Sequence, residues 1–215
     1  MQFSLSRIRG MLRPSLIAFI ALLIGCTLTS FGILQYTLSA HIKGDYILLE
    51  NDYLALEFPK DWLAFSWIDH NLAAGKSYSA LFASPHIFSV MMFRVYDQAA
   101  TQSYMQKNNL TDTLSVVIFE ASRIYNWSLE NNKNATLVFL ENGTITVSDH
   151  TALYSSFLIR DGFKQDGKLY NLTCMFISYV SNQKLVQVVF WGKEDDCRQT
   201  RDIFNTVLSS TKVKI

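Results

Sequence analysis

The chain has 215 residues, enough for one domain with a sizeable core and a short additional segment. Its formal net charge is +1, with neither a basic excess nor an acidic tail, which argues against a nucleic-acid-binding protein. With only 9 Gly and 3 Pro, the composition also excludes collagen-like and disordered classes.

The N-terminus carries a long uncharged stretch preceded by arginines. Ser15 to Leu34 contains no charge over 20 residues, which is the length that a helix needs to cross the hydrocarbon core of a bilayer. Arg7, Arg9 and Arg13 precede it and favour a cytoplasmic N-terminus. We therefore predict a cytoplasmic N-terminus, a single-pass transmembrane signal anchor, a linker and an extracytoplasmic domain, covering residues 1–14, 15–36, 37–44 and 45–215.

Two other interpretations of this stretch stay open. "LIGC", Leu23 to Cys26, resembles the lipobox of bacterial lipoproteins, in which Cys26 would carry the lipid. The apolar stretch continues beyond Cys26, however, where lipoproteins usually turn polar. A cleaved signal peptide ending near "TLSA", residues 37–40, is the third interpretation. All three place the rest of the chain outside the cytoplasm.

The domain opens with strands. The first two are predicted over residues 47–49 and 54–58, and the second alternates apolar residues with small or charged ones, as a half-buried strand does. Pro59 ends it, because proline cannot donate to a sheet ladder. Residues 79–84 and 87–97 are predicted to form two more strands. The second of these is nearly all apolar, which predicts cover on both faces.

Residues 111–130 have the periodicity of an amphipathic helix, with Asp112 placed to cap its N-terminus. Apolar residues recur at spacings of three and four and predict one buried stripe. The stripe consists of Leu114, Val117, Ile118, Ala121, Ile124 and Tyr125.

Hairpins follow this helix. Residues 135–148 are predicted to form one, with its turn at Asn142-Gly143, the dipeptide that a type I′ turn prefers. Residues 151–180 form a longer hairpin with two Asp-Gly turn signals. Residues 184–192 are an apolar strand expected near the centre of the sheet.

A helix is predicted over residues 194–210, and the position of Cys197 in it bears on how the two cysteines of the domain could pair. Cys197 shares one side of this helix with its apolar residues and therefore faces inward, whereas Cys174 opens a strand. In an exported domain such a pair predicts a disulfide between Cys174 and Cys197. The alternative is two buried free thiols.

The order of strands, helix, strands and helix, with hairpin connections, predicts an α+β fold. We expect an antiparallel β-sheet flanked by two long α-helices, an α/β/α sandwich. Because the apolar strands need cover on both faces, the helices should lie on opposite sides of the sheet.

Five N-x-[ST] sequons fall in the predicted extracytoplasmic domain, where chance would give about two. The pattern predicts N-glycosylation, and the alternative is an asparagine-rich exposed surface with incidental matches. The sites are Asn109, Asn126, Asn134, Asn142 and Asn171.

The stretch "LEFPKDW", Leu56 to Trp62, resembles the first core strand of the PsbP-like family of exported domains. The order of elements is similar too, since an apolar strand ending at Trp191 is followed by a closing helix. The resemblance covers about residues 45–215 and implies an α/β/α sandwich with a central antiparallel sheet. It also implies an accessory or binding domain without catalysis, in which Trp62 belongs to the core.

Residues that carry catalysis or bind metals do not form a recognisable pattern. The four histidines, His41, His70, His86 and His150, are dispersed, and no metal-ligand spacing, P-loop or nucleophile motif occurs. Asp195 and Asp196 stand at a predicted helix N-terminus, which attracts acids for structural reasons. We predict no catalytic residue, no metal and no cofactor.

The leading hypothesis is therefore a membrane-anchored accessory or interaction domain, without catalysis, in a membrane or cell-surface complex. A protein partner in or at the membrane is expected, no nucleic acid is expected, and no small-molecule ligand can be named. Phe65, Trp67 and His70 are the candidate binding surface, because aromatics clustered before a loop suit a contact site. The alternative is a ligand-binding surface lipoprotein or sensor lipidated at Cys26.

Overall fold

The computed structural model describes residues 41–43, 45–69 and 75–214. The predicted anchor, Cys26 and His70 lie outside these ranges. Among the described residues, no helix is both long enough and apolar enough to span a bilayer. All of them belong to one compact unit.

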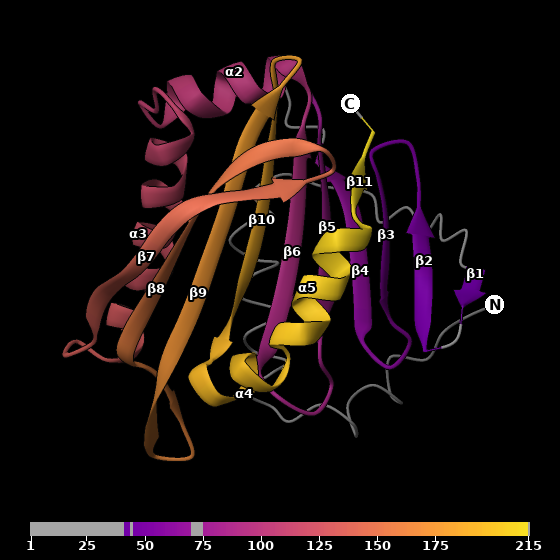
Figure 1. Cartoon of the computed structure of the whole chain (residues 1–215). Coiled ribbons are helices and arrows are strands. Elements are labelled where there is room, and N and C mark those ends of the chain that lie inside the picture. The colour runs from indigo at the N-terminus through magenta and orange to yellow at the C-terminus, as the bar shows by residue number, and fades with distance from the viewer. Residues whose placement is uncertain (1–40, 44, 70–74, 215) are drawn as a thin grey trace. The chain divides into compact units, whose positions relative to one another are not determined.

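A seven-stranded antiparallel sheet dominates the structure, with strand order β4-β5-β6-β10-β9-β8-β7 (Figure 1). Its strands are β4 (Leu63–Asp69), β5 (Ser77–Ala83), β6 (Ser89–Tyr96), β7 (Thr136–Val147), β8 (His150–Gln165), β9 (Lys168–Ser181) and β10 (Lys184–Lys193). The apolar strand over residues 184–192 is central, as predicted. The α+β class and the antiparallel pairing are likewise confirmed.

A second, four-stranded sheet was not predicted. Its order is β1-β2-β3-β11. The strands are β1 (His41–Lys43), β2 (Tyr46–Glu50), β3 (Leu54–Pro59) and β11 (Lys212–Val213). Leu54, Leu56 and Phe58 of β3 are buried in the core, and so is Trp62, as the motif "LEFPKDW" implied.

Among the described residues only one helix is long, so the prediction of two long helices flanking the sheet is wrong. The helices in this part of the chain are α2 (Gln98–Lys107), α3 (Thr113–Asn131), α4 (Glu194–Gln199) and α5 (Arg201–Ser210). The expected C-terminal helix is interrupted at Thr200, whose buried hydroxyl lies 2.7 Å from the hydroxyl of Ser89 in β6. This contact ties the interruption to the sheet.

Helix α3 begins as predicted but presents a different side to the core. The Asp112 side chain accepts a hydrogen bond from Ser115 N, which completes a capping box. The buried residues are Val116, Val117, Glu120, Ala121 and Ser128. Leu114 and Ile118 of the expected stripe are instead 44% and 53% exposed. The helix is rotated relative to the prediction so that Glu120 reaches a buried arginine, Arg94.

Type I′ turns join β7 to β8, β8 to β9 and β9 to β10. Each has two residues with positive φ, at Ser148-Asp149, Asp166-Gly167 and Asn182-Gln183. The turn predicted at Asn142-Gly143 is wrong, because these residues lie within β7. A Cβ added to Gly143 would lie 2.8 Å from the Tyr154 ring, so glycine here allows close cross-strand packing.

The helices cover opposite faces of the large sheet, as predicted (Figure 1). Phe190 of β10 stacks on Phe204 of α5, with ring centroids 4.6 Å apart. Leu185, five positions away on the same strand, clusters with Val116 of α3. Because side chains alternate along a strand, these two residues point to opposite faces. The second sheet joins α5 on its side of the core.

Candidate binding cleft

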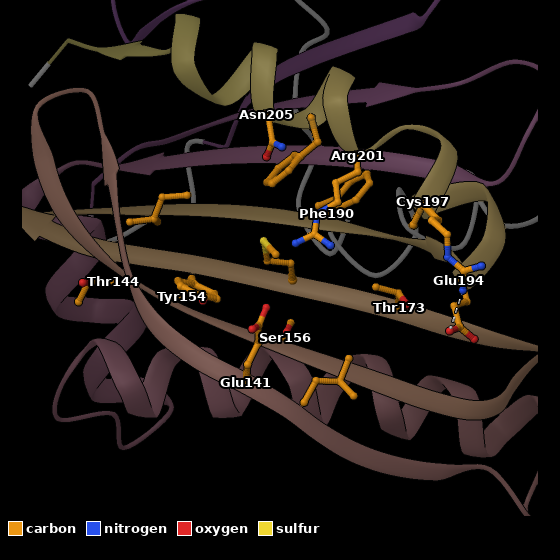
Figure 2. Close-up of a pocket in the computed structure, with 15 residues that line it drawn as sticks. Glu141, Thr144, Tyr154, Ser156, Thr173, Phe190, Glu194, Cys197, Arg201 and Asn205 are labelled. Carbon is orange, nitrogen blue, oxygen red and sulfur yellow. Dashed lines mark hydrogen bonds and ion pairs between the residues drawn. The ribbon is translucent and has the colours of Figure 1, made fainter.

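A cleft of about 500 Å³ lies between α4–α5 and the sheet face formed by β7, β8, β9 and β10 (Figure 2). Pockets of about 300–1,000 Å³ are the size that binds small ligands. We therefore take this cleft as the candidate functional site.

The floor of the cleft is largely apolar. Tyr154, Met175 and Phe190 come from β8, β9 and β10, and Phe204 comes from α5. Register pairing places Tyr154 beside Ile177 and Met175 beside Phe190, so the three strands send these side chains to one face. A flat apolar or aromatic group could lie against this surface.

One wall of the cleft is the helical segment. Phe204, Val207 and Leu208 turn into the core, which leaves Arg201 and Asn205, one turn apart, on the flank that faces the cleft. Figure 2 shows the side chains of Arg201 and Asn205 descending from α5 into the cleft. Arg201 has no ion-pair partner among the described residues.

The opposite wall is the edge strand β7. A bulge between Phe139 and Glu141 shifts its register against β8. After the bulge, Glu141 is paired with Ser156, and its side chain rises into the cleft (Figure 2). Within the described part of the chain, Glu141 has no ion-pair partner either. The cleft therefore presents an unpaired cation on one wall and an unpaired anion on the other.

At one end of the cleft, beside α4, the charged groups are paired with each other. Arg198 lies 3.4 Å from Glu194 and 3.5 Å from Asp195. Glu194 also accepts a hydrogen bond of 3.0 Å from the side-chain amide of Asn171. Because their charges are matched locally, Arg198 and Glu194 are less available to a ligand than Arg201 and Glu141.

The predicted disulfide is not formed, since Cys174 and Cys197 are both free buried thiols. Cys174 is the register partner of Trp191. The sulfur of Cys197 lies 3.0 Å from the position of a Cβ on Gly192, the next residue along β10. Adjacent residues of a strand point to opposite faces, so the two thiols lie on opposite sides of the sheet. The alternative interpretation, two buried free thiols, is therefore the one that the structure confirms.

Thiol chemistry in the cleft is disfavoured. Cys197 lines the cleft, but burial, together with the nearby Asp196 carboxylate, raises the pKa of its thiol to about 12. The thiol therefore stays protonated at neutral pH, and the thiolate is the reactive form. Burial also raises the pKa of Cys174.

The sequence-predicted binding residues lie elsewhere. Phe65 and Trp67 are half-buried on β4, the strand at the other edge of the large sheet from β7. They pair with Leu81 and Ser79 of β5 and do not line the cleft. His70 is outside the described residues. A binding role for this surface stays a prediction.

The other polar residues considered as functional candidates make contacts that support the fold or lie on the surface. Asp196 accepts a hydrogen bond of 2.8 Å from Phe88 N, which joins α4 to the β5–β6 loop. His150 stacks on Tyr179, and His86 is exposed in that loop. In the described ranges, no group of three or more His, Cys, Asp or Glu side chains is arranged to hold a metal ion.

A buried polar network lies on the face opposite the cleft. The hydroxyl of Tyr104 in α2 donates to Glu120 of α3 at 2.6 Å, and Arg94 of β6 lies 3.8 Å from the same carboxylate oxygen. Tyr96 donates to Gln187 at 3.2 Å in the same region. Burial, and then the negative charge of Glu120, raises the pKa of Tyr104, which keeps the hydroxyl as a donor. This network joins both helices to the sheet.

Four of the five sequon asparagines are exposed, namely Asn109, Asn126, Asn134 and Asn142. Asn171 is half-buried, and its amide nitrogen, the atom that a glycan would occupy, donates to Glu194. Asn171 is thus the sequon least suited to modification.

No protein-family model matches the chain, and no curated protein sequence matches it. Solved structures with a similar arrangement include LpqN of Mycobacterium tuberculosis, described as involved in cell envelope biogenesis. LpqN is 12% identical, with a TM-score of 0.37 over 74% of this chain and 82% of that chain. A second is CyanoP, the PsbP of the cyanobacterium Synechocystis, at 10% identity and a TM-score of 0.43 over 87% of this chain and 99% of that chain.

A third similar structure is a Pseudomonas aeruginosa protein of unknown function. It is 13% identical, with a TM-score of 0.30 over 78% of this chain and 96% of that chain. The PsbP-like family suggested by the sequence is thus represented among the similar structures.

Proposed function

We propose that this chain is a membrane-attached, extracytoplasmic accessory domain that binds a ligand or partner without catalysis, and that the cleft is its binding site. The observation that supports this most directly is the cleft itself, with a largely apolar floor and charged and polar groups at its walls. Binding sites commonly combine an apolar surface with a small number of polar groups that orient the ligand.

The composition of the cleft favours binding over catalysis. The described residues that line it include no histidine, and the thiol among them is held protonated by burial. Its other charged groups are arginines and glutamates, which suit recognition of a polar ligand. An accessory protein that captures a ligand needs no more than this.

Attachment to the membrane rests on the uncharged segment before the domain. The length of this segment supports a single-pass anchor with the cleft outside the cytoplasm. Lipidation at Cys26 is the competing form of attachment. Mass spectrometry of the purified chain separates the two, because an intact Met1 excludes lipoprotein processing and a diacylglyceryl group on Cys26 excludes the anchor.

Co-purification of the full chain from its native membrane tests the proposed site. The variant Asn205→Trp places a large side chain on the wall that faces the cleft, whereas Thr206→Trp places it on the same helix outside the cleft. Both positions are exposed, so both variants should fold. Mass spectrometry then identifies what each form retains in mild detergent.

We expect a small molecule or partner to be retained by the unsubstituted chain and by Thr206→Trp, and to be lost from Asn205→Trp. Equal retention by all three forms would place binding elsewhere. Recovery of the chain alone in every preparation would argue against an accessory role.

A further inference from the structure

The charges left unpaired in the cleft indicate what kind of ligand it takes. Arg201 on α5 and Glu141 on β7 extend into the same space from opposite walls (Figure 2). Their side chains have no ion-pair partner among the described residues, whereas the neighbouring Arg198 is paired twice. The cleft therefore has one free charge of each sign.

This arrangement discriminates between classes of ligand. A molecule with a single anionic head would be matched by Arg201 but leave Glu141 without a partner, and a single cation would leave Arg201 without one. A molecule that carries both charges, separated by an apolar body, complements both walls and the floor. Electrostatic complementarity of this kind sets orientation and selectivity more than raw affinity.

A short peptide combines such a body with two charged ends. Three residues of extended peptide span about 10 Å, and a cleft of about 500 Å³ lies within the range that holds small ligands. Apolar side chains of such a peptide would lie on Tyr154, Met175 and Phe190. Asn205 and Ser156 line the same space and provide amide and hydroxyl groups for the peptide backbone.

We propose that the cleft binds a short apolar peptide with free termini, its carboxylate beside Arg201 and its ammonium group beside Glu141. This inference rests on the proposed function, because it assigns a ligand class to the same site. The bound peptide lies across the apolar floor, and the two termini fix its direction.

Calorimetric titration of the full chain in mild detergent, with trileucine as the probe, tests this proposal. Three capped forms accompany it: the N-acetyl peptide, the C-terminal amide and the peptide capped at both ends. Each is titrated into the unsubstituted chain, Arg201→Gln, Glu141→Gln and a control, Arg160→Gln. Arg160 is an exposed arginine of β8 that does not line the cleft.

Each free terminus should improve binding about fivefold over its capped form, which corresponds to ~1 kcal/mol for an exposed ion pair. Arg201→Gln should abolish only the preference for a free carboxylate, and Glu141→Gln only the preference for a free amine. Arg160→Gln should keep both preferences. Partition of the peptides into detergent is common to all four proteins and cancels in these comparisons.

Several results would overturn the proposal. If Arg201→Gln and Glu141→Gln both still bind the free termini more tightly than the capped ones, these two side chains do not contact the peptide termini. Binding of laurate, a simple anionic amphiphile, in place of trileucine would assign another ligand class. If trileucine fails to bind while Asn205→Trp still releases a co-purified molecule, the peptide proposal falls and the cleft remains the binding site.

Discussion

Removing the buried carboxylate of Glu120 should destabilise the domain strongly. The side chains of Glu120 and Arg94 are only 9% and 11% exposed, so Glu120→Ala leaves an arginine charge buried and uncompensated. Breaking a buried pair in this way typically costs about 3–5 kcal/mol. Because the two charged groups are 3.8 Å apart, beyond direct hydrogen-bonding distance, we expect the lower end, about 3 kcal/mol.

Thermal unfolding of the full chain, followed by tryptophan fluorescence in mild detergent, measures this effect. A loss of about 3 kcal/mol corresponds to a fall in Tm of about 6–12 °C for a domain of this size. Glu130→Ala is the matched control, since Glu130 is exposed near the end of the same helix. It should change stability by no more than about 0.5 kcal/mol.

A double variant separates the buried charge from the other contacts of Glu120. Arg94→Met combined with Glu120→Leu replaces the ion pair with apolar side chains and should recover most of the lost stability. The reasoning is refuted if Glu120→Ala melts within about 2 °C of Glu130→Ala. It is refuted as well if the double variant is as unstable as the sum of its two single substitutions.

Three further predictions follow from local geometry. Gly143→Ala should cost about 1–3 kcal/mol in chemical denaturation, because the added Cβ would lie 2.8 Å from the Tyr154 ring; an unchanged midpoint would contradict this packing. In a glycosylating host, site mapping should find Asn126 modified and Asn171 unmodified, since the Asn171 amide already donates to a carboxylate 3.0 Å away. Equal occupancy of the two sites would mean that this hydrogen bond offers no protection. The free energy of unfolding should decline as pH rises from about 9 towards 12, because folding raises the pKa of Cys197 from its usual 9.0 to about 12 and the folded state holds the proton more tightly. Cys197→Ala should remove that component of the decline, and an identical pH profile for this variant would refute its origin in the thiol.

Structural features that depend on a few neighbouring residues were predicted well. The alternation that ends at Pro59 gave β3, and Asp112 caps α3 as expected. Asp166-Gly167 forms the turn between β8 and β9. In each case the residue's own backbone preference or hydrogen-bonding capacity determines the structure, so no distant contact is needed to predict it.

Features decided by distant contacts were missed. Asn142-Gly143 has the sequence of a turn, but pairing with β8 continues past it, and Ser148-Asp149 makes the turn instead. The expected stripe of α3 omitted Glu120, because an acidic residue reads as exposed unless its buried partner is known. Only the folded sheet brings that partner, Arg94, beneath the helix.

The cleft could not be predicted for the same reason. Its walls come from β7 and α5, which are far apart in the sequence, and neither segment carries a recognisable motif. The spacing of Arg201 and Asn205 on the polar flank of the C-terminal helix was the only signal. This spacing indicates that the two side chains share one flank of the helix. The flank becomes a wall of a site only when strands of the sheet lie opposite it, and the sequence does not show this.

The pairing of β11 with β3 constrains the order in which the domain can fold. The β7–β10 region needs only contacts between consecutive strands, which close quickly through tight turns. Lys212 pairs with Ala55, and Lys214 N donates to Tyr53 O at 2.9 Å, so the second sheet joins the beginning and the end of the domain. We expect the β7–β10 region to form early and the pairing of β3 with β11 to form late and slowly. This pairing can be completed only after α5 has been synthesised.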